Sequence, residues 1–271
     1  MDADQWAHEV DPTVPSSARM YDFYLGGTHN FAADREAARQ VIAAMPEAPM
    51  IARVNRAFLG RAVRFLLDAG VRQFLDVGSG VPTVGNVHEI AQRIAPDARV
   101  AYADVDPVAV IHARQLLAGN DRATAIEADL RRPDELLGLL HEPPQRAILD
   151  LNRPVGLLLV SMLHFVQGEE AYQAVTALRD ALAPGSYLAL THGATEGFDP
   201  QAASQVQGVY QQTTTPGGLR SRPGVQRFFG DFELVPPGLV WAREWHPEGT
   251  DDGQPSRIGM LAGVARKPIR R

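Results

Sequence analysis

The sequence predicts a mixed α/β fold built on one mostly parallel sheet, and three observations support this. Between residues 73 and 194, short runs rich in apolar and β-branched residues alternate with stretches of helical spacing. The first run leads directly into a glycine-rich turn. An acidic residue stands at or just beyond the end of each of the first three runs. Strands that alternate with helices form right-handed βαβ units, which build parallel sheets.

Five strands and four helices are expected in this alternating region. The strand runs cover residues 73–77, 99–105, 124–128, 154–165 and 186–191. The helices cover residues 84–94, a stretch that begins at Pro107, residues 133–140 and residues 169–182. A proline suits the first turn of a helix, where its missing N–H is not needed. The fourth strand run is apolar almost throughout, as expected for a strand buried on both faces.

The pattern changes after the fifth strand. Helices are expected at residues 201–212 and 221–229, and strands at residues 232–235 and 258–265. A stretch rich in Gly, Asp and Pro at residues 247–255 separates these two strands, which favours an antiparallel pair. The complete prediction is a doubly wound, mostly parallel, seven-stranded sheet with an antiparallel C-terminal strand.

Residues 1–70 precede the first strand and are predicted to be largely helical. Residues 32–45 and 51–69 carry apolar residues at three- and four-residue spacing. We expect an N-terminal helical cap or lid over residues 1–70 that belongs to the same domain as a core over residues 71–271. The segment 19–34 combines three aromatic residues with Gly26 and Gly27. It is either a loop that touches a ligand or a turn between two helices.

Composition narrows the class of protein. The chain has 271 residues, no cysteine and a formal net charge of −6. The absence of cysteine excludes thiol nucleophiles and cysteine-ligated metals, and the acidic charge argues against a nucleic-acid-binding protein. The N-terminus lacks the pattern of a signal peptide, and the longest apolar run, residues 156–166, is too short to cross a bilayer. We expect a cytoplasmic protein that acts on small molecules, away from membranes and nucleic acids.

The most informative motif is the turn from Asp76 to Gly80, with the sequence DVGSG. Its glycines permit a tight turn and let a ligand approach the backbone. A dinucleotide site favours a third small residue in G-x-G-x-x-G, but Pro82 and Thr83 stand here instead. An acid beside the glycines would repel a pyrophosphate. The turn therefore favours a ligand with a cationic group.

Two further acids follow the next two strands. Asp104 lies 26 residues after Gly78, where a carboxylate can accept the hydroxyls of a ribose. Asp129 follows the third strand and can accept a hydrogen bond from an adenine amino group. Each acid alone is more typical of a helix N-cap or a loop. Three acids at the carboxyl ends of three successive strands predict a nucleoside-binding crevice.

In the order DVGSG, ADVDP and EADL, the chain resembles the Rossmann-like (class I) S-adenosylmethionine-dependent methyltransferases. Its N-terminal RMYDFYLGG and NFAADREAA, together with LLLVSMLHFV, resemble more narrowly an actinobacterial S-adenosyl methyltransferase family without an assigned substrate. The resemblance runs from about residue 15 to residue 265.

The resemblance implies S-adenosylmethionine as cofactor and assigns its contacts by position. The matching residues are Asp76, Gly78, Ser79 and Gly80 for the methionine part; Asp104 with its neighbour Asp106 for the ribose; Asp129 and Leu130 for the adenine; Ser161 beside the transferred methyl group; and Tyr21, Gly26, Gly27 and Asn30 in a segment that closes over the cofactor. The proline at position 82 departs from the pattern and removes one backbone donor from the turn.

The expected reaction is methyl transfer to a small-molecule acceptor by in-line SN2 displacement, for which proximity is the main catalytic effect. A base is needed only for some acceptors, and His164 is the candidate, although a packed structural histidine is the alternative. His192 is a weaker candidate. His192 and Glu196 have metal-ligand spacing without a third ligand, so no metal is expected. Residues 201–230 are expected to lie above the site and to select the acceptor.

Two other functions fit parts of the sequence. A non-catalytic S-adenosylmethionine or S-adenosylhomocysteine sensor would keep the same pocket. An NAD-dependent oxidoreductase fits less well, because Asp76 and Thr83 depart from the dinucleotide pattern and the Tyr-x-x-x-Lys pair is absent. The sequence does not distinguish O-, N- and C-methylation and makes no prediction of oligomeric state.

Overall fold

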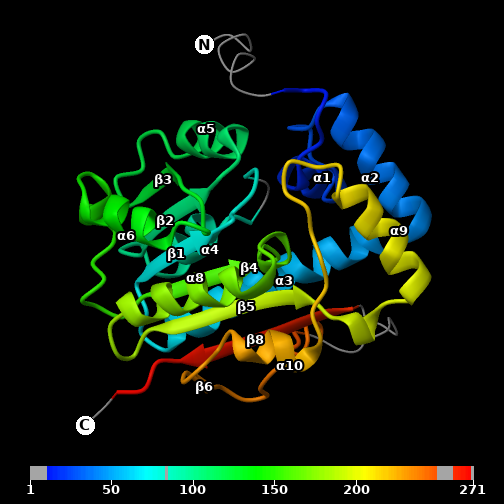
Figure 1. Ribbon diagram of the computed structural model, residues 1–271. Coiled ribbons are helices and arrows are strands. Elements are labelled where there is room, and N and C mark those ends of the chain that lie inside the picture. Colours follow the sequence, from blue (N-terminus) through cyan, green and yellow to red (C-terminus); the bar gives the residue numbers. More distant parts are fainter. Residues whose placement is uncertain (1–10, 83–84, 249–258, 270–271) are drawn as a thin grey trace.

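A computed structural model describes residues 11–82, 85–248 and 259–269, and these form a single sheet flanked by helices (Figure 1). Within these residues the sheet has eight strands in the order β3-β2-β1-β4-β5-β8-β6, and the short β7 pairs with β8. Strands from β3 to β5 are parallel, whereas β8 runs antiparallel to β5, β6 and β7. The strands are β1 Gln73–Val77, β2 Arg99–Asp104, β3 Ala123–Glu127, β4 Gly156–Val160, β5 Tyr187–Gly193, β6 Glu233–Leu234, β7 Val240–Trp241 and β8 Met260–Arg266.

The predicted fold class is confirmed, with two differences in detail. The fourth strand ends at Val160, not at residue 165, because Ser161 adopts a left-handed backbone conformation with φ of 59°. The apolar run then continues into a 3-10 turn, Leu163–Phe165. The eighth strand, β7, has only two residues and gives no periodic pattern in the sequence. The loop predicted over residues 247–255 lies largely outside the described residues, as does Thr83.

Helices cover both faces of the sheet. In the described residues they are α1 Ser17–Tyr24, α2 Ala32–Ala44, α3 Ala48–Asp68, α4 Val87–Ile94, α5 Pro107–Leu116, α6 Pro133–His141, α7 Gln145–Ile148, α8 Gly168–Ala181, α9 Pro200–Tyr210 and α10 Arg222–Arg227. Side chains of α3, α4 and α5 pack on one face, and those of α6, α8 and α10 on the other.

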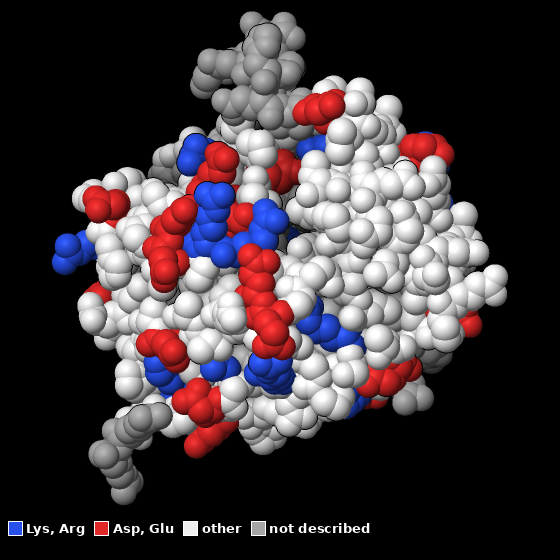
Figure 2. Space-filling model, viewed as in Figure 1, with Lys and Arg blue, Asp and Glu red and all other residues white. Residues whose placement is uncertain are grey.

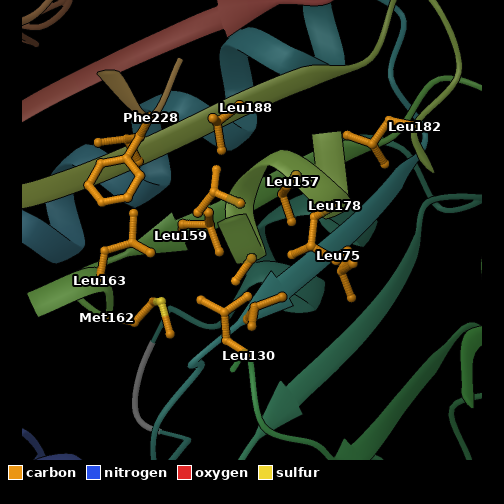
Figure 3. Close-up of a cluster of buried hydrophobic side chains, with 14 of the residues drawn as sticks. Leu75, Leu130, Leu157, Leu159, Met162, Leu163, Leu178, Leu182, Leu188 and Phe228 are labelled. Atoms are coloured by element: carbon orange, nitrogen blue, oxygen red, sulfur yellow. The ribbon is translucent and has the colours of Figure 1, made fainter. Parts of the chain in front are cut away.

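Successive residues of the central strands serve the two faces in turn. Leu157 and Leu159 of β4 belong to the core under α8, where they meet Leu178 (Figure 3), whereas Leu158 belongs to the core under α3. All three leucines are fully buried. This double burial explains why the strand reads as a continuous apolar run and not as an alternating one.

A third apolar cluster lies apart from the sheet and joins α1, α2, α9 and the first turns of α3. We call α1, α2 and α9 the cap. Figure 1 shows the cap beyond the ends toward which the strand arrows of β4 and β5 point. In α9 no residue is buried, although Val206, Val209 and Tyr210 pack partly against α1 and α2. The cap therefore combines N-terminal helices with one helix from the segment that follows β5.

A buried guanidinium fastens the cap to the sheet. Arg19 of α1 is 2% exposed, and its Nε donates to Asp34 of α2 at 2.8 Å. One of its terminal nitrogens donates to Asp106, which precedes α5, at 3.2 Å. Ser16 adds bonds to both carboxylates, from its backbone N–H to Asp34 and from its hydroxyl to Asp106. Asp106 also caps α5 by accepting from the N–H of Val108 at 2.9 Å.

Replacing Arg19 with Met should remove about 3–5 kcal/mol from the free energy of unfolding, because two buried carboxylates lose their shared cation. Urea denaturation measures this loss. Arg39→Met is the matched control, since Arg39 is 61% exposed and pairs with Glu36 on the surface. The control should change stability by less than about 1 kcal/mol. A loss below about 1 kcal/mol in Arg19→Met would show that the network does not hold the cap.

Candidate active site

A cavity of about 530 Å³ lies between the carboxyl ends of the parallel strands and the cap. Residues from β1, β2, β4 and the loop after β3 line one side, and residues from α1, α2, α3 and α9 line the other. In Figure 2 a recess is visible near the middle of the face, between a group of mixed charges and the largely uncharged surface over α1, α2 and α9. The crevice predicted at the strand ends is present in this position.

The glycine turn after β1 has the predicted backbone requirement. Gly78 and Gly80 have φ of 70° and 68°, values that favour glycine. A Cβ on Gly78 would lie 2.5 Å from the Cβ of Met162, which follows β4. The backbone N–H of Gly78 donates to the carbonyl of Ala103 at 2.8 Å. The turn therefore contacts Met162 on one side and Ala103 on the other. Its two glycines and Ser79 line the cavity.

Asp104 links this turn to the next strand. Its carboxylate accepts from the backbone N–H of Gly80 at 2.7 Å and from that of Asp106 at 2.9 Å. Burial raises the pKa of Asp104 to about 6, although these backbone hydrogen bonds oppose the rise. Each carboxylate oxygen retains acceptor capacity for a further hydroxyl. Asp104 lines the cavity and is suitably placed to receive a ribose.

Asp76 is a buried carboxylate that faces the cavity without a hydrogen-bond donor from the described residues. Burial raises its pKa to about 7, partly opposed by the cation of Arg56 and reinforced by Asp104. An under-compensated carboxylate of this kind fits a ligand that brings a positive charge, such as a sulfonium or an ammonium group. The residues present therefore fit S-adenosylmethionine, which carries both.

Asp129 and Leu130 also line the cavity, beyond β3. Burial alone would raise the pKa of Asp129, but hydrogen bonds from Arg131 outweigh it and lower the pKa. The guanidinium of Arg131 reaches the carboxylate at 2.6 Å and itself lines the cavity. Leu130 is buried and, with Val105, gives this end of the cavity apolar walls. Sequence reasoning did not identify Arg131 as a partner of Asp129.

A chain of buried hydrogen bonds crosses the middle of the cavity wall from the cap to β4. The hydroxyl of Tyr21 donates to the carbonyl of Ala52 at 3.0 Å and accepts from Asn55 at 2.9 Å. The Thr191 hydroxyl donates to Asn55 Oδ1 at 2.6 Å and accepts from the Ser161 N–H at 2.8 Å. The left-handed conformation of Ser161 is thereby held in place. Tyr21 and Ser161 both line the cavity as expected.

Sequence reasoning missed Asn55 and Arg56 of α3, which also line the cavity. Asn55 is four residues from both Ile51 and Leu59, so it is a polar residue at a core position of an amphipathic helix. That interruption is the signal that would have identified it. Arg56 donates to the carbonyl of Gly85 at 3.2 Å, and its charge acts on Asp76.

His164 lines the cavity next to Ser161. Its Nε2 lies 3.2 Å from the Ser161 hydroxyl, and the N–H of Gly193 points to its Nδ1 at 3.4 Å. Nδ1 is then the acceptor, and Nε2 carries the hydrogen. Burial lowers the pKa of His164 well below its ordinary value, and nearby His192 and Arg220 lower it further. These contacts favour a neutral, structurally fixed imidazole.

His192 is fully buried in the protein interior and does not line the cavity. Its Nδ1 donates to the carbonyl of Gly193 at 2.8 Å, and Arg220 donates to its Nε2 at 2.7 Å. Burial lowers the pKa of His192 to about 4. Glu196 instead accepts from the N–H of Arg222. Within the part of the chain that the structure describes, no three potential metal ligands come together.

Four residues assigned to the cofactor by resemblance lie off the cavity wall: Asp106, Gly26, Gly27 and Asn30. Asp106 belongs to the network of Arg19. The other three form the turn between α1 and α2, which agrees with the helix–helix alternative for this segment. The side-chain amide of Asn30 donates to Asp22 at 2.7 Å and to the carbonyl of Gly27 at 3.0 Å. A Cβ on Gly27 would lie 1.9 Å from Asp22 Oδ1.

Comparison with known proteins decides the family. A family model described as S-adenosyl methyltransferase matches residues 3–268. The chain belongs to the S-adenosyl methyltransferase family. It is therefore an S-adenosylmethionine-dependent methyltransferase, and the predicted enzyme class and cofactor are confirmed. No curated protein matches the chain.

Two crystal structures are similar to this methyltransferase over nearly the whole chain. One is a methyltransferase candidate from Thermobifida fusca YX, with 40% identity, a TM-score of 0.87 and coverage of 95% of this chain and 96% of that chain. The other is a DUF574 family protein from Streptomyces avermitilis MA-4680, with 40% identity, a TM-score of 0.89 and coverage of 95% and 99%.

A more distant structure is similar in fold alone. Human N-acetylserotonin methyltransferase, solved in complex with S-adenosylmethionine, has 14% identity and a TM-score of 0.50 over 96% of this chain and 72% of that chain. In the described part of the methyltransferase, every helix is too short or too polar to traverse a bilayer.

The raised pKa of Asp76 predicts a pH-dependent stability difference. Between about pH 4 and about pH 7, the Asp76 carboxyl group is protonated in the folded protein and ionised in the unfolded chain. The stabilisation that this proton contributes is fully present below about pH 4 and is lost as the pH rises through about 7. Without ligand, Asp76→Asn should therefore be more stable than the parent by roughly 2–4 kcal/mol at pH 8. Near pH 4 the two should agree to within about 1 kcal/mol.

Urea denaturation at both pH values measures this difference. Asp121→Asn is the control, because Asp121 is 80% exposed, and it should show no pH-dependent gain. Equal stability of Asp76→Asn and parent at pH 8 would mean that the carboxylate is already compensated.

The turn between α1 and α2 predicts a structural role for Gly27. Gly27→Ala should lower the free energy of unfolding by roughly 2 kcal/mol or more, because the new methyl displaces the buried, hydrogen-bonded carboxylate of Asp22. Gly26→Ala, with φ of 81° and open space around it, should cost only about 1 kcal/mol. Neither change should weaken S-adenosylhomocysteine binding in calorimetry more than about threefold at a temperature where both proteins are folded. Normal stability with lost binding would instead support a cofactor contact.

Proposed function

We propose that this methyltransferase acts on a small-molecule acceptor enclosed between the strand ends and the cap, with orientation of the reactants as the main catalytic effect. The observation that carries the proposal is one continuous cavity, lined by Asp76 and Asp104 on one side and by apolar residues of the cap on the other. Its volume of about 530 Å³ falls within the range of sites that enclose small ligands. The cap covers the site, which favours a small acceptor over a macromolecular one.

The geometry supports the following roles in holding the cofactor. Asp76 would face its cationic groups, and the turn around Gly78 would let it approach the backbone. Asp104 would accept the ribose hydroxyls, and Asp129 would meet the adenine amino group beside Leu130. When bound, S-adenosylmethionine supplies a methyl group on a sulfonium, which an acceptor lone pair takes in line while the electrons of the broken carbon–sulfur bond stay on sulfur.

Ser161, Met162 and His164 directly follow β4 and line the cavity, where they would stand at the junction between its cofactor side and its cap side. The chain through Thr191 and Asn55 fixes Ser161, and Met162 packs against the glycine turn. Since Nδ1 of His164 faces Gly193 and its Nε2 faces Ser161, we propose that this histidine positions the junction and is not a general base. Proximity alone can lower a barrier of this kind by roughly 7–11 kcal/mol.

Calorimetric titration tests the proposed cofactor site. S-adenosylmethionine and S-adenosylhomocysteine should bind, and NAD should not. Asp104→Ala should weaken S-adenosylhomocysteine binding by at least tenfold, equivalent to about 1.4 kcal/mol, because the ribose loses its acceptor. Asp121→Ala, a change of the same type at a surface position, should leave the affinity unchanged.

Two results would contradict the assignment. Binding of NAD without either adenosyl ligand would contradict the cofactor site as a whole. An Asp104→Ala variant that is folded and binds within threefold of the parent would contradict the ribose contact alone.

A further inference from the structure

The charges of the cavity lie on one side. The charged residues of its described lining are Arg56, Asp76, Asp104, Asp129 and Arg131, and these surround the strand ends and the glycine turn. The cap side carries no Lys, Arg, Asp or Glu among the described lining residues. Its polar groups are hydroxyls and amides. The segment that contributes α9, residues 200–219, contains no charged residue at all.

A charged acceptor would therefore be buried on the cap side without a counter-ion. Taking an ionised group out of water costs several kcal/mol unless a partner of opposite charge or several hydrogen bonds replace the water. His164, the histidine among the described lining residues, is held neutral by its burial and by neighbouring His192 and Arg220. The cap side of the cavity therefore favours uncharged molecules over charged ones.

The same side is rich in aromatic rings. Tyr24 of α1 and Tyr210 of α9 line it, and the adjoining lining includes Phe165 of the 3-10 turn, whose ring contacts Tyr210, and Phe198, two residues before α9. The rings of Phe165 and Tyr210 are 5.8 Å apart between centroids and are tilted by 50°. Aromatic pairs in such arrangements contribute roughly 0.5–1.5 kcal/mol beyond the burial of their area. A planar ring is therefore better matched to these walls than a flexible aliphatic chain.

Two of these rings also offer one directed hydrogen bond. The hydroxyls of Tyr24 and Tyr210 lie 3.4 Å apart and are each other's partner among the described residues. Two hydroxyls carry two hydrogens, and their mutual contact uses only one. The second hydrogen remains available to a polar atom of a ligand. Burial raises the pKa of both tyrosines, so they stay protonated as donors.

We propose that the acceptor is an uncharged aromatic molecule whose ring system packs among Tyr24, Phe165, Phe198 and Tyr210 and whose polar substituent accepts a hydrogen bond from the paired tyrosine hydroxyls. This inference rests on the proposed function, because it names the acceptor class of the same cavity.

A pair of probe molecules that differ in charge tests the acceptor class. Calorimetry at pH 7 in the presence of saturating S-adenosylhomocysteine compares 2-naphthol, which is neutral, with 2-naphthoate, which has the same rings and a negative charge. We expect 2-naphthol to bind and 2-naphthoate to bind at least tenfold more weakly. Equal or tighter binding of 2-naphthoate, or binding of neither probe, would overturn the proposal.

Two variants of α9 locate the bound probe. Ala203 lines the cavity, whereas Gln205 on the same helix is exposed and does not. Ala203→Phe should weaken 2-naphthol binding at least tenfold by filling the space, and Gln205→Phe should leave it unchanged. Both variants should fold, because α9 has no buried residue, and both should retain S-adenosylhomocysteine affinity.

The readouts distinguish the placement of the acceptor from the cofactor site. Unchanged 2-naphthol affinity in Ala203→Phe would overturn the placement of the acceptor while leaving the cofactor site intact. Failure of S-adenosylhomocysteine to bind the parent protein would contradict the proposed function itself.

Discussion

The buried guanidinium of Arg19 is the interaction on which the architecture of the site depends. It holds together Asp34 of the cap and Asp106, which lies between β2 and α5, and both carboxylates are almost inaccessible to water. The backbone N–H of Asp106 in turn donates to Asp104. Only one residue, Val105, therefore separates the attachment of the cap at Asp106 from Asp104, the acid proposed to hold the ribose. The position of the cap and the shape of the cofactor edge are linked through this short path.

The cavity inside this frame is electrostatically divided. Carboxylates gather at the strand ends, where burial raises the pKa of Asp76 to about 7 and that of Asp104 to about 6. Uncharged side chains gather under the cap. This division matches the proposed pairing of a sulfonium cofactor with a neutral acceptor, in which each ligand would meet a different half. The acids on the cofactor side reduce the stability of the ligand-free fold, and a cationic ligand would offset that cost.

Much of this arrangement was predictable because it depends on short-range patterns. The strands β1, β2, β3 and β5 follow from apolar runs, and the turn at Gly78 follows from its glycines. Asp104 was correctly expected at a strand end that faces the cavity. Periodicity does not identify β7, which has two residues, or the end of β4, where one left-handed residue stops an otherwise uniform apolar run.

The partners of individual side chains, both inside the turn between α1 and α2 and between distant segments, were not predictable from the sequence. Gly26, Gly27 and Asn30 form a tight turn around Asp22, and a turn that holds a carboxylate has the same composition as a turn that holds a ligand. Asn55 reaches Thr191 across 136 positions of the chain. Arg220, which donates to the buried imidazole of His192, follows it by 28 positions.

The loose packing of α9 has a consequence for how acceptor preference can change over evolutionary time. A substitution in a helix without buried residues removes little of the stability that the folded state depends on, so many variants of this helix remain foldable. The cofactor edge has no such freedom, because a methyl group at Gly78 collides with Met162. Under the proposed function, the fold would place substrate choice on a helix that tolerates substitution and the cofactor contacts on a turn that does not. Related proteins with this arrangement could then change their acceptors through α9 while the turn at Gly78 stays unchanged.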